Sequence, residues 1–225
     1  MTQPSEYPVV DRLITEDDTP VDHLPSEKQQ RLLTEPLYSS WVGPGLDRTF
    51  LVAANMGIFT STNEPPIIPA VFLSLDVQLA ENWWERKHRS YFVWEFGKVP
   101  EVVIEIVSNT EGNEDIKKKA RYRRMRIPYY VIFDPTRQLR GPVLQMWELQ
   151  GLQYVTLTDY WLAEVQLGLT LWEGSFEGRE EVWLRWCDEH GTVIPTGAER
   201  ANQAQQRAQR LAERLRALGI DPEAD

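Results

Sequence analysis

The run of residues from Val99 to Val107 constrains the fold more than any other segment. It reads VPEVVIEIV, and a nearly continuous β-branched run of this kind is typical of a strand that is buried on both faces. A helical segment over about 114–126 follows, and Pro128 ends it. A second apolar run, YYVIF at 129–133, comes next. Two buried strands joined by a helix predict a βαβ crossover with parallel strands.

Shorter elements lie on either side of this crossover. A helix is expected to start at Ser26 as its cap, because Glu27 falls in the first turn and Leu33 and Leu37 follow at helical spacing. Strands are expected at 49–54 and 67–75. Residues 80–98 are expected to form a loop that contains a short strand near 91–95. Further short strands are expected at 143–149, 152–157, 169–174 and 181–187. The last four predict a β-meander attached to the core.

Composition changes at both ends divide the 225 residues into three parts. Residues 1–25 are acidic and proline-rich, which favours an extended arm over a helix. Residues 26–194 hold the strands and helices of the expected folded domain. Residues 195–225 become rich in alanine, glutamine and arginine, and the leucines at 211, 215 and 218 fit an exposed helix or a short coiled coil.

Charge and apolar content limit the classes of protein that this chain can represent. It carries 24 basic and 34 acidic residues, a net charge of −10. No apolar run approaches the ~18–20 residues of a spanning helix, and the first residues lack the pattern of a signal peptide. We therefore expect a cytoplasmic protein that does not enter a membrane. The acidic balance argues against nucleic-acid binding over the whole surface, but residues 117–126 carry seven positive charges and no acid.

Glu105 is the first candidate functional residue, because it interrupts the apolar strand run. A buried carboxylate is costly unless it has a partner. One interpretation is a strand-end carboxylate that pairs with an arginine. The other is a metal ligand that faces a cleft, since hard divalent cations bind anionic oxygen atoms. Strand alternation places Val103, Glu105 and Val107 on one face.

Lys118 is the lysine expected to reach Glu105. Lys118, Tyr122 and Met125 fall on one stripe of the helix that follows the strand. If Tyr122 and Met125 pack toward the sheet, Lys118 points the same way. The rest of the basic run fits either a solvated helix face or a surface for a phosphate backbone. The candidate nucleic-acid-binding residues are Lys117, Lys119, Arg121 and Arg124.

The segments from about 26–135 resemble the Uma-two family, a restriction-endonuclease-like group with the PD-(D/E)xK fold. The resemblance rests on IPAVFLSLDV, EVVIEIVSN, the D-x-x-K and K-x-x-x-Y pattern of the helix, and YYVIFDP, in that order. The second half, with TLWEGSFEGREEVWLRWC and the Ala/Arg-rich tail, is similar to an extended subgroup of that family. The resemblance implies an α/β fold: a mixed central sheet flanked by helices, with the β-meander and terminal helix appended.

The same resemblance implies a DNA endonuclease that depends on Mg²⁺ or Mn²⁺. In such folds the metal ion polarises the phosphate and lowers the pKa of a bound water, and a lysine assists the nucleophile. By the resemblance, Glu105 matches the glutamate ligand and Lys118 matches a lysine that has moved onto the helix. The carbonyl of Ile106 is expected to complete the ligand shell, and Glu27 on the first helix is a further candidate carboxylate.

Position 70 departs from the family pattern. The family strand reads Pro-Asp-Val, whereas this chain reads Pro69-Ala70-Val71. Alanine supplies no ligand, so one of the two principal carboxylates is missing and weak or absent cleavage is expected. Either the chain is a naturally degenerate member or Ala70 has been introduced. The alternative function is a non-enzymatic binding or assembly protein that reuses the fold, and a homodimer formed through the terminal helix is expected in either case.

Several other residues with reactive or aromatic side chains are expected to be structural. Asp134 precedes a proline at a strand end and is predicted to cap a turn. Cys187 lies in a tryptophan-rich strand and is predicted to be a buried small hydrophobe. Trp83, Trp84 and Trp94 could stack on bases, but a core position is the favoured interpretation.

Overall fold

The computed structural model describes residues 23–45, 48–108, 114–219 and 221. The predicted acidic arm therefore lies outside the described residues, except for residues 23–25. Residue 23 directly precedes the first helix, α1, which spans Leu24–Ser40 and so includes residues 24 and 25. The expectation of a cap at Ser26 was wrong, because His23 occupies the cap position and Ser26 lies buried inside the first turn. Pro25 fits there, since the first helical N–H groups have no intrahelical partner.

Six strands form the central sheet, in the order β1-β3-β5-β6-β7-β8. Their bounds are β1 Phe50–Ala54, β3 Val71–Leu75, β5 Val102–Ile106, β6 Tyr129–Phe133, β7 Leu144–Gln150 and β8 Gln153–Thr156. Strands β5 and β6 pair in parallel, with Ile104 opposite Val131, and the other neighbouring pairs in this sheet are antiparallel. The predicted βαβ crossover and the mixed α/β fold are confirmed.

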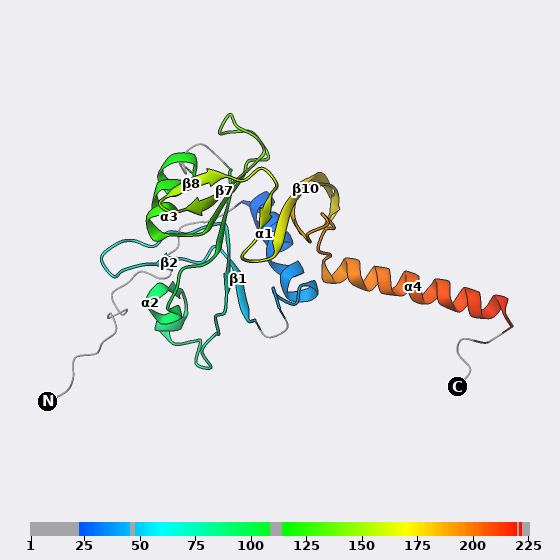
Figure 1. Cartoon of the computed structure of the whole chain (residues 1–225). Coiled ribbons are helices and arrows are strands. Elements are labelled where there is room, and N and C mark those ends of the chain that lie inside the picture. The colour runs from blue at the N-terminus through cyan, green and yellow to red at the C-terminus, as the bar shows by residue number, and fades with distance from the viewer. Residues whose placement is uncertain (1–22, 46–47, 109–113, 220, 222–225) are drawn as a thin grey trace.

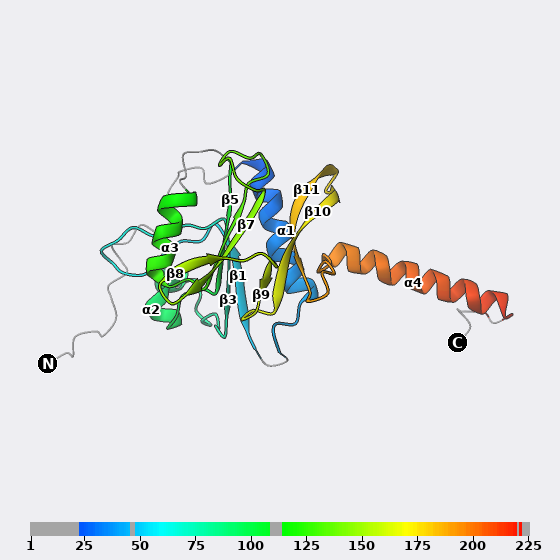
Figure 2. The same cartoon turned by 45° about the horizontal axis from the view of Figure 1, so that its top comes forward.

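Helices cover the two faces of this sheet (Figures 1 and 2). On one face α1 packs its Leu33 and Leu37 onto a core that includes Ile104 and Val131. On the other face lies the crossover helix, a π-helical turn over Glu114–Lys118 that continues as α3, Lys119–Met125. Its Tyr122 is fully buried in a second core. Each of the β5 and β6 strands is thus buried on both sides, as its continuous apolar sequence requires.

The region between β1 and β5 differs from the expectation. The strand predicted over 67–75 is shorter, and Ile67 instead makes an isolated bridge to Ile58. Here β2 (Ile58–Phe59) and β4 (Tyr91–Phe92) form a small parallel pair, and the expected strand near 91–95 turns into the short helix α2, Val93–Phe96. A 3-10 turn covers Arg86–His88.

The core interpretation of the neighbouring tryptophans was wrong for two of the three. Trp83 and Trp84 are exposed and pack edge-to-face against each other, with ring centroids 5.7 Å apart. Trp94 is half-buried beside Phe92. The aromatic content of this segment reflects a surface turn, because an aromatic run without a helical or strand period has no single face to bury.

The predicted β-meander is split between two sheets. Strands β7 and β8 extend the central sheet, whereas β9 (Trp161–Leu162), β10 (Leu167–Phe176) and β11 (Arg179–Cys187) form a separate antiparallel sheet. This second sheet packs against α1, where Trp186 Nε1 donates a 2.7 Å hydrogen bond to the carbonyl of Leu33. The indole N–H thus gains a buried acceptor in α1. Local sequence patterns do not predict this contact, because the two residues are 153 positions apart.

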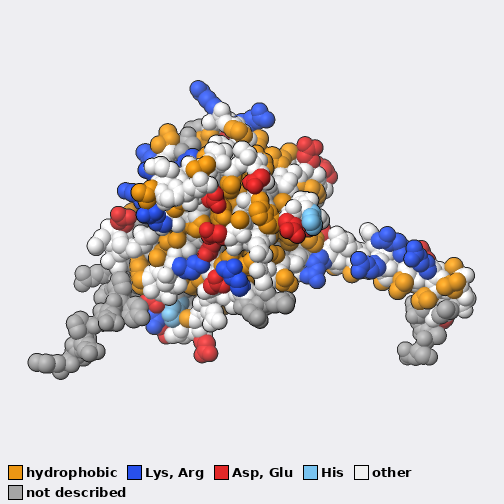
Figure 3. Space-filling view, viewed as in Figure 1, with side chains coloured by type: hydrophobic (Ala, Val, Ile, Leu, Met, Phe, Trp, Pro, Cys, Tyr) orange, Lys and Arg blue, Asp and Glu red, His pale blue; other side chains and the backbone are white. Residues whose placement is uncertain are grey.

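The last helix, α4, spans Gly197–Ala217 and projects away from the body of the molecule (Figure 1). It starts with a capping box formed by Thr196 and Glu199. The buried Arg185 donates to both carboxylate oxygens of Glu199 and so anchors this end. In Figure 3 basic side chains gather along one edge of α4 and hydrophobic side chains along another. The coiled coil, and the boundary at residue 195, remain predictions. Among the described residues no helix is long and apolar enough to cross a membrane.

Candidate active site

Glu105 lies near the carboxyl end of β5, on the face that α3 covers. Its side chain is 3% exposed. Its neighbours two residues away on the same face, Val103 and Val107, belong to the apolar core beneath α3. An ionised carboxylate in such surroundings needs hydrogen-bond donors or an opposite charge to offset the loss of water.

Two side chains from the crossover helix supply those partners. Tyr122 donates a 2.6 Å hydrogen bond to Oε1 of Glu105, and Lys118 Nζ lies 3.0 Å from Oε2. The expected contact between Lys118 and Glu105 is therefore confirmed, and this charge partner is a lysine and not the arginine of the alternative interpretation. Whether either residue takes part in catalysis remains a prediction.

The helix geometry explains why these two side chains arrive together. Lys118 and Tyr122 are four residues apart, which places them one above the other on a helix face. Tyr122 is also held by the ring of Tyr130 on β6, at a centroid distance of 5.2 Å. Burial, and then the nearby Glu105 carboxylate, raises the pKa of Tyr122 well above its usual value, so the hydroxyl stays protonated and donates. The sequence analysis predicted only a packing role for Tyr122. The spacing of four residues from Lys118 could have indicated that both side chains reach Glu105.

Ala70 comes directly before β3, the strand that pairs with β5. Val71 pairs with Ile104, and Phe72 with Val103, in the antiparallel ladder between β3 and β5. The same register carried one residue further sets Ala70 opposite Glu105. Directly opposite residues point to the same face with Cβ atoms about 4.5–5.5 Å apart. The position at which the family pattern has aspartate is thus the position from which a second carboxylate would meet Glu105.

The side chains present do not make a full magnesium site. Mg²⁺ takes oxygen ligands in octahedral geometry, and the described residues contain no group of three histidine, cysteine, aspartate or glutamate side chains that could hold a metal. Glu105 is the one carboxylate at the site among them, and both its oxygens already accept hydrogen bonds. Asp76, which directly follows β3, pairs instead with Arg48, and this contact also lowers the pKa of Asp76. The donor set that the described residues provide therefore fits a divalent metal poorly.

Two further predicted ligands are not brought together with Glu105 by any described contact. Glu27 lies on α1, which covers the other face of the sheet, and forms an ion pair of 2.6 Å with Arg31. Ile106 ends β5, and its half-buried side chain packs against the core beneath α1. The metal-binding roles assigned to Glu27 and to the Ile106 carbonyl stay predictions.

The basic residues of the crossover helix divide into exposed and packed groups. Lys117 and Arg124 are exposed. The amino group of Lys119 lies 3.4 Å from the centroid of the Trp147 ring, and Arg121 donates to the carbonyls of Pro65 and Pro66. Lys119 and Arg121 therefore help to attach the helix to its surroundings, and phosphate binding by all four residues remains a prediction.

Asp134 and Cys187 have the structural positions expected of them. The carboxylate of Asp134, which is fully buried, accepts hydrogen bonds from the backbone N–H groups of Gln138 and Leu139, at 2.9 and 2.8 Å. It caps the turn after β6, as predicted. Cys187 is buried, and burial raises the pKa of its thiol.

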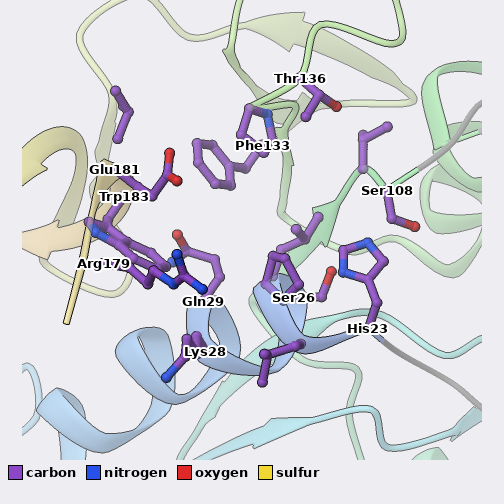
Figure 4. A pocket seen from close by; sticks show the side chains of 16 residues that line it. His23, Ser26, Lys28, Gln29, Ser108, Phe133, Thr136, Arg179, Glu181 and Trp183 are labelled. Atoms are coloured by element: carbon purple, nitrogen blue, oxygen red, sulfur yellow. The ribbon is translucent and has the colours of Figure 1, made fainter. Parts of the chain in front are cut away.

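A cavity of about 360 Å³ lies on the opposite face of the sheet from Glu105, at the same carboxyl edge of β5 and β6. Figure 4 shows Ser26 and Gln29 entering it from α1, Phe133 from β6 and Trp183 from β11. Sequence reasoning missed this cavity because its walls come from segments more than 150 residues apart, and no local pattern reports that they meet.

The mixed sheet with helices on both faces, and the carboxylate and lysine that meet near the end of its parallel pair, define an α/β protein of the restriction-endonuclease-like class. A family model matches the chain over residues 6–172: this is Uma2, described as “putative restriction endonuclease”. The chain therefore belongs to the Uma2 family. No curated protein matches it.

Proposed function

We propose that this chain is a divalent-metal-dependent DNA endonuclease of the PD-(D/E)xK type whose phosphodiester hydrolysis is impaired by Ala70. The observation that carries the proposal is the contact of Lys118 with Glu105, one residue beyond the pair of Ile104 with Val71, which position 70 precedes. Membership of the Uma2 family supports the nuclease class. The impairment follows from the ligand count, because one carboxylate remains where the family pattern has two.

The residues that are present retain two parts of the expected chemistry. The ammonium group of Lys118 is positioned to stabilise negative charge on a phosphate beside Glu105. Tyr122 fixes the direction of the Glu105 carboxylate. A Mg²⁺ or Mn²⁺ ion would be held here by Glu105 and would supply Lewis-acid activation of the phosphate. Because the donor set fits such an ion poorly, we expect slow or absent cleavage by the unaltered chain.

The experiment is to restore the missing carboxylate. The unaltered chain and Ala70→Asp are assayed for nicking of plasmid, branched and single-stranded DNA with Mg²⁺ or Mn²⁺. Ala70→Asn is the matched control, since it has the size of aspartate without the charge. We expect nicking by Ala70→Asp alone, abolished by the added change Glu105→Gln. Equal inactivity of all variants on every substrate would reject the nuclease proposal.

A second function has its own support: a non-enzymatic binding or assembly protein. Both oxygens of Glu105 are already hydrogen-bonded inside the protein, which is a stable arrangement without a metal. In addition, α4 projects from the body with Leu211 and Leu218 exposed. In this proposal the partners are DNA at the basic helix and a second copy of the chain at α4. Unchanged DNA binding by chains that never cleave would favour it.

A further inference from the structure

The cavity beside α1 is separate from the Glu105 site. Its lining includes Ile106, the last residue of β5, and Val107, which follows that strand, but most of its wall comes from α1 and β11 on the face that α1 covers. Its volume of about 360 Å³ falls within the roughly 300–1,000 Å³ range of small-molecule pockets. Neither Lys118 nor Tyr122 lines it. A ligand here would therefore not displace the residues that hold Glu105.

Ser26 places an unsatisfied hydroxyl in this cavity. The residue is 1% exposed, and its Oγ has no hydrogen-bond partner among the residues that the structure describes. Its side chain points upward from α1 toward the interior of the cavity in Figure 4. A buried hydroxyl without a partner is unfavourable, so its presence at a cavity wall points to a polar ligand atom at that place.

The surroundings of Ser26 favour an anionic group. Ser26 belongs to the first turn of the 17-residue helix α1, where backbone N–H groups lack intrahelical partners and the helix dipole favours negative charge. Arg179 lines the cavity as an exposed side chain and makes no ion pair among the described residues, whereas Lys28 is already paired with Glu177 at 2.5 Å. Among the described lining residues, Arg179 is thus the arginine or lysine at the rim that has no carboxylate partner.

The remaining wall favours a flat ring. Phe133 and Trp183 are both almost fully buried and line the cavity together with Val182. The amide of Gln29 donates to the carbonyl of Leu184 at 2.8 Å and accepts from its N–H at 3.0 Å, so the position of this side chain is fixed. The small exposed parts of the Phe133 and Trp183 rings give this wall an apolar surface, against which the apolar part of a base can pack. Glu181 at the rim adds an acceptor for a ring N–H or amino group.

We propose that this cavity binds one nucleotide, with its base against Phe133 and Trp183 and its phosphate at the start of α1 near Ser26 and Arg179. The inference rests on the proposed function in one respect: a DNA strand bound at Glu105 would pass the same carboxyl edge of β5, and an unstacked nucleotide of that strand could enter the cavity there. A free mononucleotide carries the same base and phosphate and could bind in the same way. The cavity would then hold a single unpaired nucleotide of the substrate and so favour single-stranded or distorted DNA.

The test is calorimetric titration of the full chain, without metal, with dTMP and dAMP. Deoxyribose 5-phosphate and inorganic phosphate serve as probes that lack the base, and a short single-stranded oligonucleotide tests binding within a strand. We expect both nucleotides to bind and the base-free probes to bind at least about tenfold more weakly, since the base carries most of the contact.

Ser26→Ala separates a ligand-binding role from a structural one. It should weaken nucleotide binding by about tenfold, the loss of one hydrogen bond to a charged group. It should also leave the melting temperature unchanged or higher, because it removes an unsatisfied buried hydroxyl. Thr34→Ala is the matched control on the same helix: Thr34 Oγ1 bonds the carbonyl of Gln30, so its loss should not alter nucleotide binding.

Three results would overturn the inference: no nucleotide binding at millimolar concentration, equal binding of the base-free probes, or equal affinity of Ser26→Ala and the unaltered chain. If the mononucleotides bind but the oligonucleotide does not, the cavity takes free nucleotides and the link to a DNA strand is rejected. The titration needs no metal and no cleavage. Nucleotide binding can therefore be found even if Ala70→Asp does not nick DNA, and nicking can be found even if no nucleotide binds, so the failures of the two proposals are distinguishable.

Discussion

The hydroxyl of Tyr122 lies 2.6 Å from Oε1 of Glu105, and this hydrogen bond joins the crossover helix to the strand that precedes it. The pair is buried between α3 and the sheet. It fixes one oxygen of the carboxylate while Lys118, one helical turn away, takes the other. The position of Glu105 thus depends on the packing of α3, and any chemistry at Glu105 depends on the same contact.

The first prediction concerns this hydrogen bond. Tyr122→Phe leaves a buried carboxylate oxygen without its donor, so we expect the free energy of unfolding to fall by about 1.5–3 kcal/mol. Tyr38→Phe is the control, because the Tyr38 hydroxyl bonds only the neutral backbone of Val52: it donates to the carbonyl and accepts from the N–H. Tyr38 is also 58% exposed, so water can replace these partners and the loss should be only about 0.5–1.5 kcal/mol. Urea unfolding measures both. Equal losses, or no coupling between Tyr122→Phe and Glu105→Gln in a double-mutant cycle, would contradict the prediction.

The second prediction concerns the exposed part of the basic helix. If Lys117 and Arg124 contact phosphates, replacing both by glutamine should weaken DNA binding. It should also make the slope of log affinity against log salt concentration shallower, by roughly 0.9 for each lost contact. Arg123 and Arg126 are controls of the same charge: they donate to Gln153 and to the carbonyl of Gly151.

Fluorescence anisotropy across a range of salt concentrations measures these affinities. We expect the Arg123→Gln, Arg126→Gln double variant to change the slope less than the Lys117→Gln, Arg124→Gln double variant does. An identical salt slope for the two double variants would mean that DNA does not distinguish Lys117 and Arg124 from the two arginines that are hydrogen-bonded within the protein, and the assigned surface would be wrong.

The third prediction concerns α4. The buried Arg185 needs Glu199 as its partner, so the helix should be shortened after residue 203 and not removed completely. We expect the full chain to be a dimer and the chain lacking 204–225 to be a monomer, as measured by light scattering. Leu211→Glu with Leu215→Glu should have the same effect, and Gln206→Glu, on another face of α4, should not. A full chain that is already monomeric would reject the predicted homodimer.

The sequence was sufficient for the parts of this fold that local patterns encode. The continuous apolar runs at β5 and β6 and the helix between them predicted the parallel crossover, and helical spacing predicted that Lys118 would reach Glu105. Both are confirmed by the register and by the 3.0 Å contact. These inferences succeed because each depends on residues within one short segment of chain.

The predictions that failed depend on residues that are far apart in the sequence. Strands β7 and β8 join the central sheet because β7 pairs with β6, and the sequence of residues 143–187 does not indicate this pairing. Serine is a residue type that favours the cap position, but a proline is also tolerated in the first turn, where its missing N–H costs no hydrogen bond. The helix therefore starts before Pro25 and not at Ser26. The cavity and the Tyr122 hydrogen bond require distant elements to be placed in space, which hydrophobic periodicity does not do.

The central claim is that position 70 is the missing second ligand opposite Glu105, and metal binding tests it most directly. Calorimetric titration with Mn²⁺ compares the unaltered chain, Ala70→Asp, Ala70→Asn and the double variant Ala70→Asp, Glu105→Gln. The account predicts that Ala70→Asp binds one Mn²⁺ at least about tenfold more tightly than the other three, since affinity follows the number of charged ligands. Equal affinity of all four proteins would contradict it.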